Sequence, residues 1–139
     1  MKRLLAVLLV VMLLYSCNGK NKIVGEWSAK GTYEANEMLI FKDDGTFLSV
    51  KGENGETSFG FKVGKAKFEL NTSKSPNTID YVFFDSDGKE EVVRLRGIVE
   101  FLGQNVARLG FNTNKRDLIE MMSRPKNFND CDIKMISRK

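Results

Sequence analysis

Residues 37–51 read EMLIFKDDGTFLSVK, in which two largely apolar segments of six residues flank Asp43-Asp44-Gly45. An Asp-Gly pair between apolar segments is a strong local signal for a β-hairpin, because both central positions of the tight turn favour a positive φ. The stretch therefore predicts two antiparallel strands, 37–42 and 46–51, with a tight turn between them.

Short strand candidates separated by turn residues continue on both sides of this hairpin. They lie at 23–30, 59–63, 65–70, 78–85, 91–102, 106–112 and 132–138. The inward-facing phase slips by one residue at Gly64-Lys65, and such a slip predicts a bulge or a tight turn there. Residues 115–123 are expected to form one or two helical turns, and no long helix is indicated.

This spacing indicates an all-β fold. Strands that recur roughly every 8–12 residues are typical of a sandwich or an antiparallel barrel. The local hairpins favour a single antiparallel up-and-down β-barrel of about eight strands, because closure of the sheet removes its exposed edges. A barrel of that size is either packed solid by its own side chains or holds one small ligand.

The first 17 residues, MKRLLAVLLVVMLLYSC, differ in character from the rest of the chain. The apolar run 4–14 is shorter than the roughly 20 residues that a transmembrane helix needs, and with its basic start it fits a secretory signal peptide. The motif Leu14-Tyr15-Ser16-Cys17 resembles the lipobox of bacterial lipoproteins, with the bulky Tyr15 as its one departure. The resemblance implies cleavage before Cys17 and lipid attachment to Cys17. The alternative is an ordinary secretory signal followed by a coincidental cysteine.

The chain is therefore expected to have three parts: a lipoprotein signal peptide (1–16), the lipidated Cys17 with a short polar tether (17–22), and a barrel domain (23–139). Acyl chains anchor strongly, because each buried CH2 contributes about 0.8 kcal/mol. We expect a cell-envelope protein held on a membrane by this lipid. The outer membrane, facing the periplasm, is expected in a Gram-negative cell, since Asn18 is not the aspartate that retains some lipoproteins at the inner membrane.

Composition narrows the function classes. Removal of the signal leaves 123 residues, enough for one domain, and lowers the net charge from +4 to +2 because Lys2 and Arg3 leave with it. A nearly balanced charge without a dense basic run argues against nucleic acid as a partner. The chain has no histidine and two cysteines, Cys17 and Cys131, which excludes His-based triads and the common zinc sites. We expect a non-enzymatic protein with no cofactor and no metal.

Two acidic features leave alternatives open. The motif Asp85-x-Asp87-Gly88 has the alternating carboxylates of a calcium loop, yet it also suits a hairpin turn, which we expect.

Asp80 lies between apolar residues of a predicted strand, and a buried carboxylate needs a partner. The candidate partners are nearby backbone groups and the side chains of Arg94, Arg96 and Arg124. A structural contact is favoured over a catalytic acid, because no second acid is placed beside Asp80 by the sequence.

Several motifs resemble a known family. Gly25-Glu26-Trp27 resembles the G-x-W of the first strand of lipocalins, in which the glycine allows close backbone approach and the indole closes one end of the barrel. The stretches 61–85, 96–111 and 123–128 resemble a family of bacterial lipocalin-like domains that has no settled function. The residues that carry this second resemblance are Pro76, Ile79, Asp80, Gly97, Ile98, Arg124, Pro125 and Phe128, with Val99 in place of a tyrosine.

The resemblance implies a lipocalin-like barrel in which a late basic side chain packs across the indole of Trp27. We expect Arg124 in this position, with Arg138 as the second candidate, through a cation–π contact worth about 0.5–2 kcal/mol. Gly25, Trp27 and Arg124 are thus expected to close the barrel. Their role is structural and does not identify a ligand.

The aromatic residues, ten Phe, three Tyr and one Trp, sit mostly at alternating strand positions. They either line a cavity for a small hydrophobic or amphipathic ligand or fill the barrel. A filled barrel would act through its loops, at 52–57, 71–77 and 112–129, as a protein-interaction module of the cell envelope. A hydrolytic enzyme is the least favoured hypothesis, because no nucleophile site is recognisable.

Overall fold

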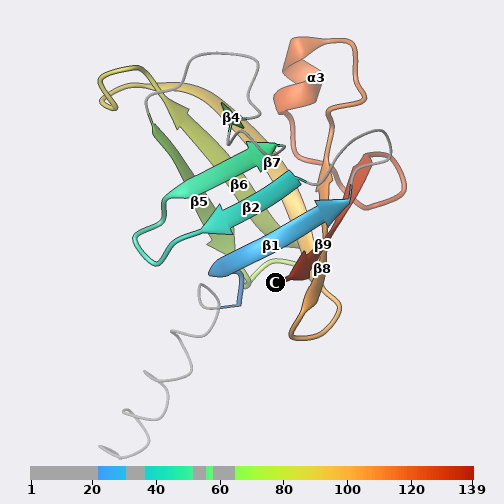
Figure 1. The fold of residues 1–139 in the computed structure, drawn as a ribbon. Coiled ribbons are helices and arrows are strands. Elements are labelled where there is room, and N and C mark those ends of the chain that lie inside the picture. Colours follow the sequence, from blue (N-terminus) through green and yellow to red (C-terminus); the bar gives the residue numbers. More distant parts are fainter. Residues whose placement is uncertain (1–21, 31–36, 52–55, 58–64) are drawn as a thin grey trace, which may run out of the picture.

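The structure, a computed structural model of the chain, describes residues 22–30, 37–51, 56–57 and 65–139. Its strands form one antiparallel sheet in the order β4-β3-β2-β1-β9-β8-β7-β6-β5 (Figure 1). The elements are β1 (Gly25–Lys30), β2 (Glu37–Phe41), β3 (Phe47–Lys51), β4 (Glu56–Thr57), β5 (Lys65–Asn71), β6 (Asn77–Phe84), β7 (Glu91–Phe101), β8 (Val106–Phe111), α3 (Leu118–Met122) and β9 (Asp132–Arg138).

The sheet curls until its two ends meet. Thr46, just before β3, forms an isolated antiparallel bridge with Lys67 of β5, and the amide of Phe68 donates to the carbonyl of Gly45 at 2.9 Å. Within the described residues, eight strands of at least five residues run up and down around a nearly closed barrel, with β4 as a two-residue addition. The predicted all-β, up-and-down barrel is confirmed.

The hairpin at residues 37–51 forms as predicted, but its turn has a different geometry. The amide of Gly45 donates to the carbonyl of Lys42 at 3.0 Å, and the amide of Lys42 donates to the carbonyl of Thr46 at 2.9 Å. Gly45 has a φ of 84°, and no non-glycine residue of the described part has a positive φ. This pattern is that of a three-residue loop in which one residue, here the glycine, is left-handed. The expectation of two left-handed central positions is therefore wrong.

Most of the other predicted elements lie where the sequence pattern placed them. Strand β9 coincides with the predicted 132–138, and the other described strands of five residues or more agree to within two residues. Strand β4 lies in the stretch 52–57, for which the sequence pattern predicts a loop. Helix α3 falls inside the predicted 115–123, and its N-cap, Asp117, accepts hydrogen bonds from the amides of Ile119 and Glu120 at 2.8 and 3.1 Å. The predicted strand 59–63 and the slip at Gly64 lie outside the described residues.

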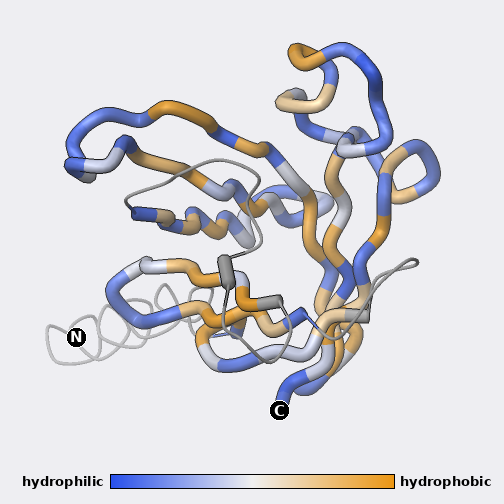
Figure 2. Tube along the Cα trace, turned by 45° about the horizontal axis from the view of Figure 1, so that its top comes forward, coloured by the Kyte–Doolittle hydropathy of each residue, from blue (hydrophilic) through white to orange (hydrophobic). Residues whose placement is uncertain are grey.

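The buried apolar side chains of the core lie on the inner face of the barrel. Figure 2 shows hydrophobic residues along the strands and hydrophilic residues at the turns that join them. Five aromatic rings from different strands pack together inside, with neighbouring ring centroids 4.1–6.3 Å apart. They belong to Phe41, Phe47, Phe68, Tyr81 and Phe111. Packing of this kind stabilises the barrel mainly through burial of apolar area.

Residues 112–131, the outer segment, connect β8 to β9 and pack on the outside of the barrel wall. A Cβ atom on Gly110 would lie 2.8 Å from Sγ of Cys131 and 3.2 Å from the Phe128 ring, so the missing side chain permits this close approach. The guanidinium of Arg108 lies 4.1 Å from the centre of the Phe128 ring. The outer segment therefore covers part of the outer face of β7 and β8.

Candidate functional site

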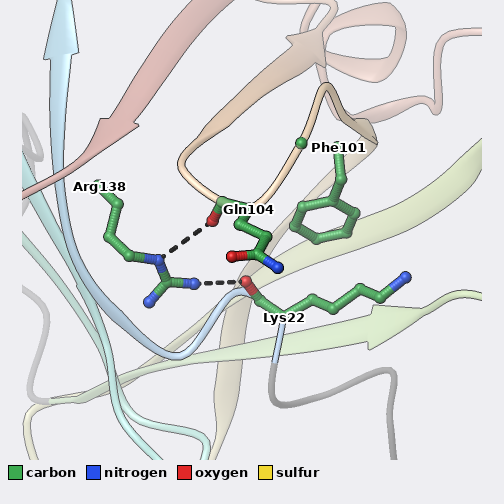
Figure 3. A pocket seen from close by; sticks show the side chains of 5 residues that line it. Lys22, Phe101, Gln104 and Arg138 are labelled. Carbon is green, nitrogen blue, oxygen red and sulfur yellow. Dashed lines mark hydrogen bonds between the residues drawn. The ribbon is translucent and has the colours of Figure 1, made fainter.

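The end of the barrel where the chain enters β1, called the Trp27 end below, is built around a buried indole. Trp27 is fully buried, and its Nε1–H donates to the carbonyl of Ile23 at 2.7 Å. The guanidinium of Arg138 lies 4.5 Å from the centre of the Trp27 ring. It donates to three main-chain carbonyls, those of Val24 (2.8 Å), Lys22 (2.8 Å) and Gln104 (3.3 Å). Figure 3 draws the bonds to Lys22 and Gln104.

The basic residue across the indole is thus Arg138, and the expectation that Arg124 lies there is wrong. The reason is the strand register, since β1 and β9 pair with Trp27 directly opposite Arg138. Arg124 belongs to the outer segment and cannot reach the interior. The glycine of the G-x-W motif is explained by the same contact: a Cβ on Gly25 would lie 2.7 Å from Nη1 of Arg138, and Gly25 has a φ of +133°.

Arg124 instead pairs with Asp80 on the outer face. Asp80 is 8% exposed, and its Oδ1 lies 2.7 Å from Nη2 of Arg124. Its Oδ2 lies 3.2 Å from Nη1 of Arg94, which also pairs with Glu69 and Glu91. These carboxylates raise the pKa of Arg94, and the largest effect comes from the hydrogen bonds that Arg94 donates to Glu91. The prediction that Asp80 is buried beside arginine is confirmed for Arg94 and Arg124.

Arg96 is the third arginine that the sequence offered to Asp80. It stands opposite Asp80 in the strand register, but its Nη1 donates to the carbonyl of Met122 at 3.5 Å. It therefore bonds to the outer segment. Nη1 of Arg124 likewise donates to the carbonyl of Gly97, at 2.6 Å.

The motifs of the later strands converge at the contact between the outer segment and the barrel wall. Residues far apart in sequence meet there, namely Asp80, Gly97, Ile98, Arg124, Pro125 and Phe128. A pocket of about 520 Å³ lies beside them, lined by Asn71, Lys74, Ser75, Pro76, Thr78, Ile98, Arg124, Pro125 and Lys126. These contacts attach the outer segment to the wall.

A polar group outside the predicted site residues lies on the inner face. Glu37 is 9% exposed and Ser49 is 1% exposed. The hydroxyl of Ser49 donates to Oε1 of Glu37 at 2.5 Å, and the ammonium of Lys134 pairs with Oε2. The signal was present in the alternation of the 37–51 hairpin, in which residues 37 and 49 share the inward phase with Leu39, Phe41 and Phe47.

Tyr81 lies among these inner-face residues. It is 7% exposed, and its hydroxyl is buried without a hydrogen-bond partner, unlike the side chains of Glu37 and Ser49. Burial raises the pKa of the Tyr81 phenol, and the nearby charge of Glu37 raises it further. The barrel thus places a hydroxyl that could hydrogen-bond a ligand close to a carboxylate that is already satisfied.

The two polar regions of the interior lie toward opposite ends of the barrel. Arg138, Ile136 and Lys134 point to the same side of β9, because side chains alternate along a strand. Ile136 is fully buried between the other two. Lys134 is thus separated from Arg138 by roughly 13 Å, at about 3.3 Å per residue. Glu37 and its partners lie away from the Trp27 end.

The acidic motif at residues 85–88 forms a turn. Oδ1 of Asp85 accepts hydrogen bonds from the amides of Lys89 (2.8 Å) and Glu90 (3.3 Å). The amide of Gly88, whose φ is +69°, donates to the carbonyl of Asp85 at 2.9 Å. Among the described residues, no group of three or more acidic or cysteine side chains is placed to hold a metal ion.

The predicted lipid attachment site, Cys17, lies outside the described residues. No helix in the part of the chain that the structure describes has the length and apolar character to cross a membrane. Comparison with known proteins finds no matching family model, no matching curated protein and no matching solved structure.

Proposed function

We propose that this chain is a membrane-tethered, lipocalin-like lipoprotein whose barrel binds a small amphipathic molecule without chemical turnover. The observation that carries the proposal is the buried hydroxyl of Tyr81, which has no hydrogen-bond partner in the described structure. Leaving such a group unsatisfied costs about 1–3 kcal/mol. A ligand that hydrogen-bonds to this hydroxyl would recover that free energy.

The surroundings of Tyr81 suit an amphipathic ligand. Its ring stacks on Phe47 at 4.1 Å and contacts Phe111 at 4.8 Å between centroids, so the apolar part of the ligand would meet aromatic rings. The charge of Glu37 is balanced by Lys134. An uncharged polar group, such as a hydroxyl or carbonyl, therefore fits beside Tyr81 better than an ion.

The proposal of a membrane tether is based on the signal-like start of the chain and on Cys17. Labelling of cells with radioactive palmitate tests it directly. We expect label in the wild-type chain and none in Cys17→Ser. Label that persists in Cys17→Ser would contradict lipid attachment at that position. The cell envelope is the proposed location, and in a Gram-negative cell the periplasmic face of the outer membrane.

Ligand binding is tested by native mass spectrometry of residues 18–139, which contain every described strand, after expression in a bacterial periplasm. We expect an adduct of lipid-like mass on the wild type and a reduced adduct on Tyr81→Phe. Urea unfolding supplies the control, because Tyr81→Phe should be at least as stable as the wild type. Equal adducts on the two proteins would contradict a binding role for the hydroxyl.

The alternative is a filled barrel that acts through its loops as a protein-interaction module. The observation that favours it is the exposure of two apolar residues on α3, Leu118 at 66% and Ile119 at 76%. A photo-crosslinking residue at position 118 would then give a discrete product in the native envelope. The same group at Val92, an exposed position at the start of β7, is the control and should give none.

A further inference from the structure

We propose that the Trp27 end of the barrel is a membrane-contacting surface. Its pocket would bind the phosphate of an anionic phospholipid headgroup, and Leu102 would enter the apolar part of the membrane interface. This inference rests on the lipid anchor of the proposed function and adds the orientation of the barrel and the chemistry of its contact. Lys22, Arg138 and Leu102 are the residues that carry it.

The chain between the anchor and the Trp27 end is short. Lys22 lies at the Trp27 end, where its carbonyl accepts from Arg138, and Cys17 stands five residues before it in the sequence. Five residues span at most about 18 Å when fully extended. A lipid on Cys17 therefore holds this end of the barrel near the membrane. Glu37, Ser49 and Lys134 lie toward the opposite end and would face away from it.

The guanidinium of Arg138 carries an uncompensated charge. Arg138 donates to three neutral carbonyls and lies over Trp27, and within the described residues no carboxylate pairs with it. A guanidinium has five N–H groups, so two remain for another acceptor. Phosphate oxygens suit them, because charge-assisted hydrogen bonds from arginine to phosphate are short and strong.

The pocket at the Trp27 end combines positive charge with polar and aromatic groups. It has a volume of about 410 Å³ and is lined by Lys22, Phe101, Gly103, Gln104 and Arg138. Figure 3 shows the Lys22 side chain running below the Phe101 ring, with the Gln104 amide between them. Lys22 is exposed and has no ion-pair partner in the described part of the chain. The lining thus offers two cations and an amide beside an aromatic ring.

The loop next to the pocket supplies the apolar contact. Leu102 directly follows β7 and is 52% exposed, and the following Gly103, Gln104 and Asn105 carry no charge. Leucine is among the apolar residues that enter the membrane interface readily.

Glu26 is an acidic residue that is also exposed near this end, where its carbonyl accepts from the amide of Lys139. The affinity needed from the pocket is small, because the anchor already provides a high effective concentration.

The test uses the full lipidated chain in vesicles that contain brominated phosphatidylcholine, which quenches nearby tryptophan. Leu102→Trp is compared with Val92→Trp. The two positions lie at opposite ends of β7 and are both 52% exposed in the wild type, so they differ mainly in their place along the barrel. Trp27 contributes the same background to both. We expect a loss of fluorescence for Leu102→Trp and no loss beyond the Trp27 background for Val92→Trp.

The headgroup contact is tested by adding phosphatidylglycerol to the vesicles. We expect it to deepen the quenching of Leu102→Trp, and we expect Lys22→Gln to abolish this increase. Lys89→Gln, an exposed change in the 85–90 turn, should leave it intact. Equal quenching at positions 102 and 92 in an anchored chain overturns the inference and leaves the anchor standing. A wild-type chain that takes up no palmitate overturns the anchor and the inference with it.

Discussion

Arg138 and Trp27 stand opposite each other across β1 and β9, and the guanidinium lies 4.5 Å from the centre of the indole. The same guanidinium bonds to the carbonyls of Lys22, Val24 and Gln104. One side chain thereby joins the start of the first strand, the last strand and the turn between β7 and β8. Arg138 therefore links three separate segments of the chain at the Trp27 end.

Replacing Arg138 should therefore weaken the whole barrel. We expect Arg138→Ala to lower the free energy of unfolding by about 2–3 kcal/mol, from the lost cation–π contact and the lost hydrogen bonds. Because Trp27 is the only tryptophan, its fluorescence should also change in the folded state. Arg124→Ala is the matched variant, and it should leave the folded-state fluorescence unchanged. A fluorescence change in Arg124→Ala alone would contradict this assignment.

Neutralising Asp80 should also destabilise the fold. In Asp80→Asn the guanidiniums of Arg94 and Arg124 lose a buried counter-charge, and we expect a loss of about 2–3 kcal/mol in urea unfolding. Glu69→Gln removes an exposed partner of the same Arg94 and should cost no more than about 1 kcal/mol. Similar losses in the two variants would show that burial of Asp80 is energetically unimportant.

Tyr81 should make the barrel sensitive to alkali. Its pKa is raised in the folded state by burial and by Glu37, whereas in the unfolded chain it stays near the ordinary value of about 10. The unfolded state therefore releases the proton first, so the stability present below about pH 10 is lost as the pH rises further. Tyr81→Phe should remove this part of the loss. Urea unfolding of both proteins between about pH 9 and pH 11 measures the difference.

Gly97 should tolerate no side chain while Phe111 is present. A Cβ at this position would lie 2.4 Å from the Phe111 ring, so Gly97→Ala forces a rearrangement that should cost about 1–3 kcal/mol. The double variant with Phe111→Leu relieves the clash. Thermal unfolding should show that Gly97→Ala is less harmful in the Phe111→Leu background than in the wild type. Additive losses would mean that the two residues do not interact.

The parts of the fold that depend on local pattern were predictable from the sequence. Alternation of period two located the strands, and Asp-Gly and similar pairs located the turns, since both signals act within a few residues. The turn at Gly45 differs from the prediction because Asp44 keeps a negative φ. There its carboxylate accepts from the amide of Thr46 at 2.8 Å. A side-chain hydrogen bond of this kind competes with the doubly left-handed turn.

The candidate site was less predictable, because it depends on pairing between distant strands. Whether Arg124 or Arg138 lies over Trp27 is decided by the register of β1 against β9, which local sequence does not reveal. The inner polar group joins Glu37 to Lys134, 97 residues later. Alternation indicated that residue 37 faces inward, but nothing near it in the sequence indicated its partner.

The packing of the outer segment has a consequence for the chemistry of the chain's thiol. Cys131 lies against Gly110, and burial together with the charges of Asp132 and Asp130 raises its pKa. Since the thiolate is the species that attacks disulfides, the raised pKa lowers the fraction of this thiol that is ready to exchange. With Cys17 acylated as proposed, the anchored chains would lie at high local density on a membrane. Even in an oxidising compartment, few of them would be cross-linked in pairs through Cys131.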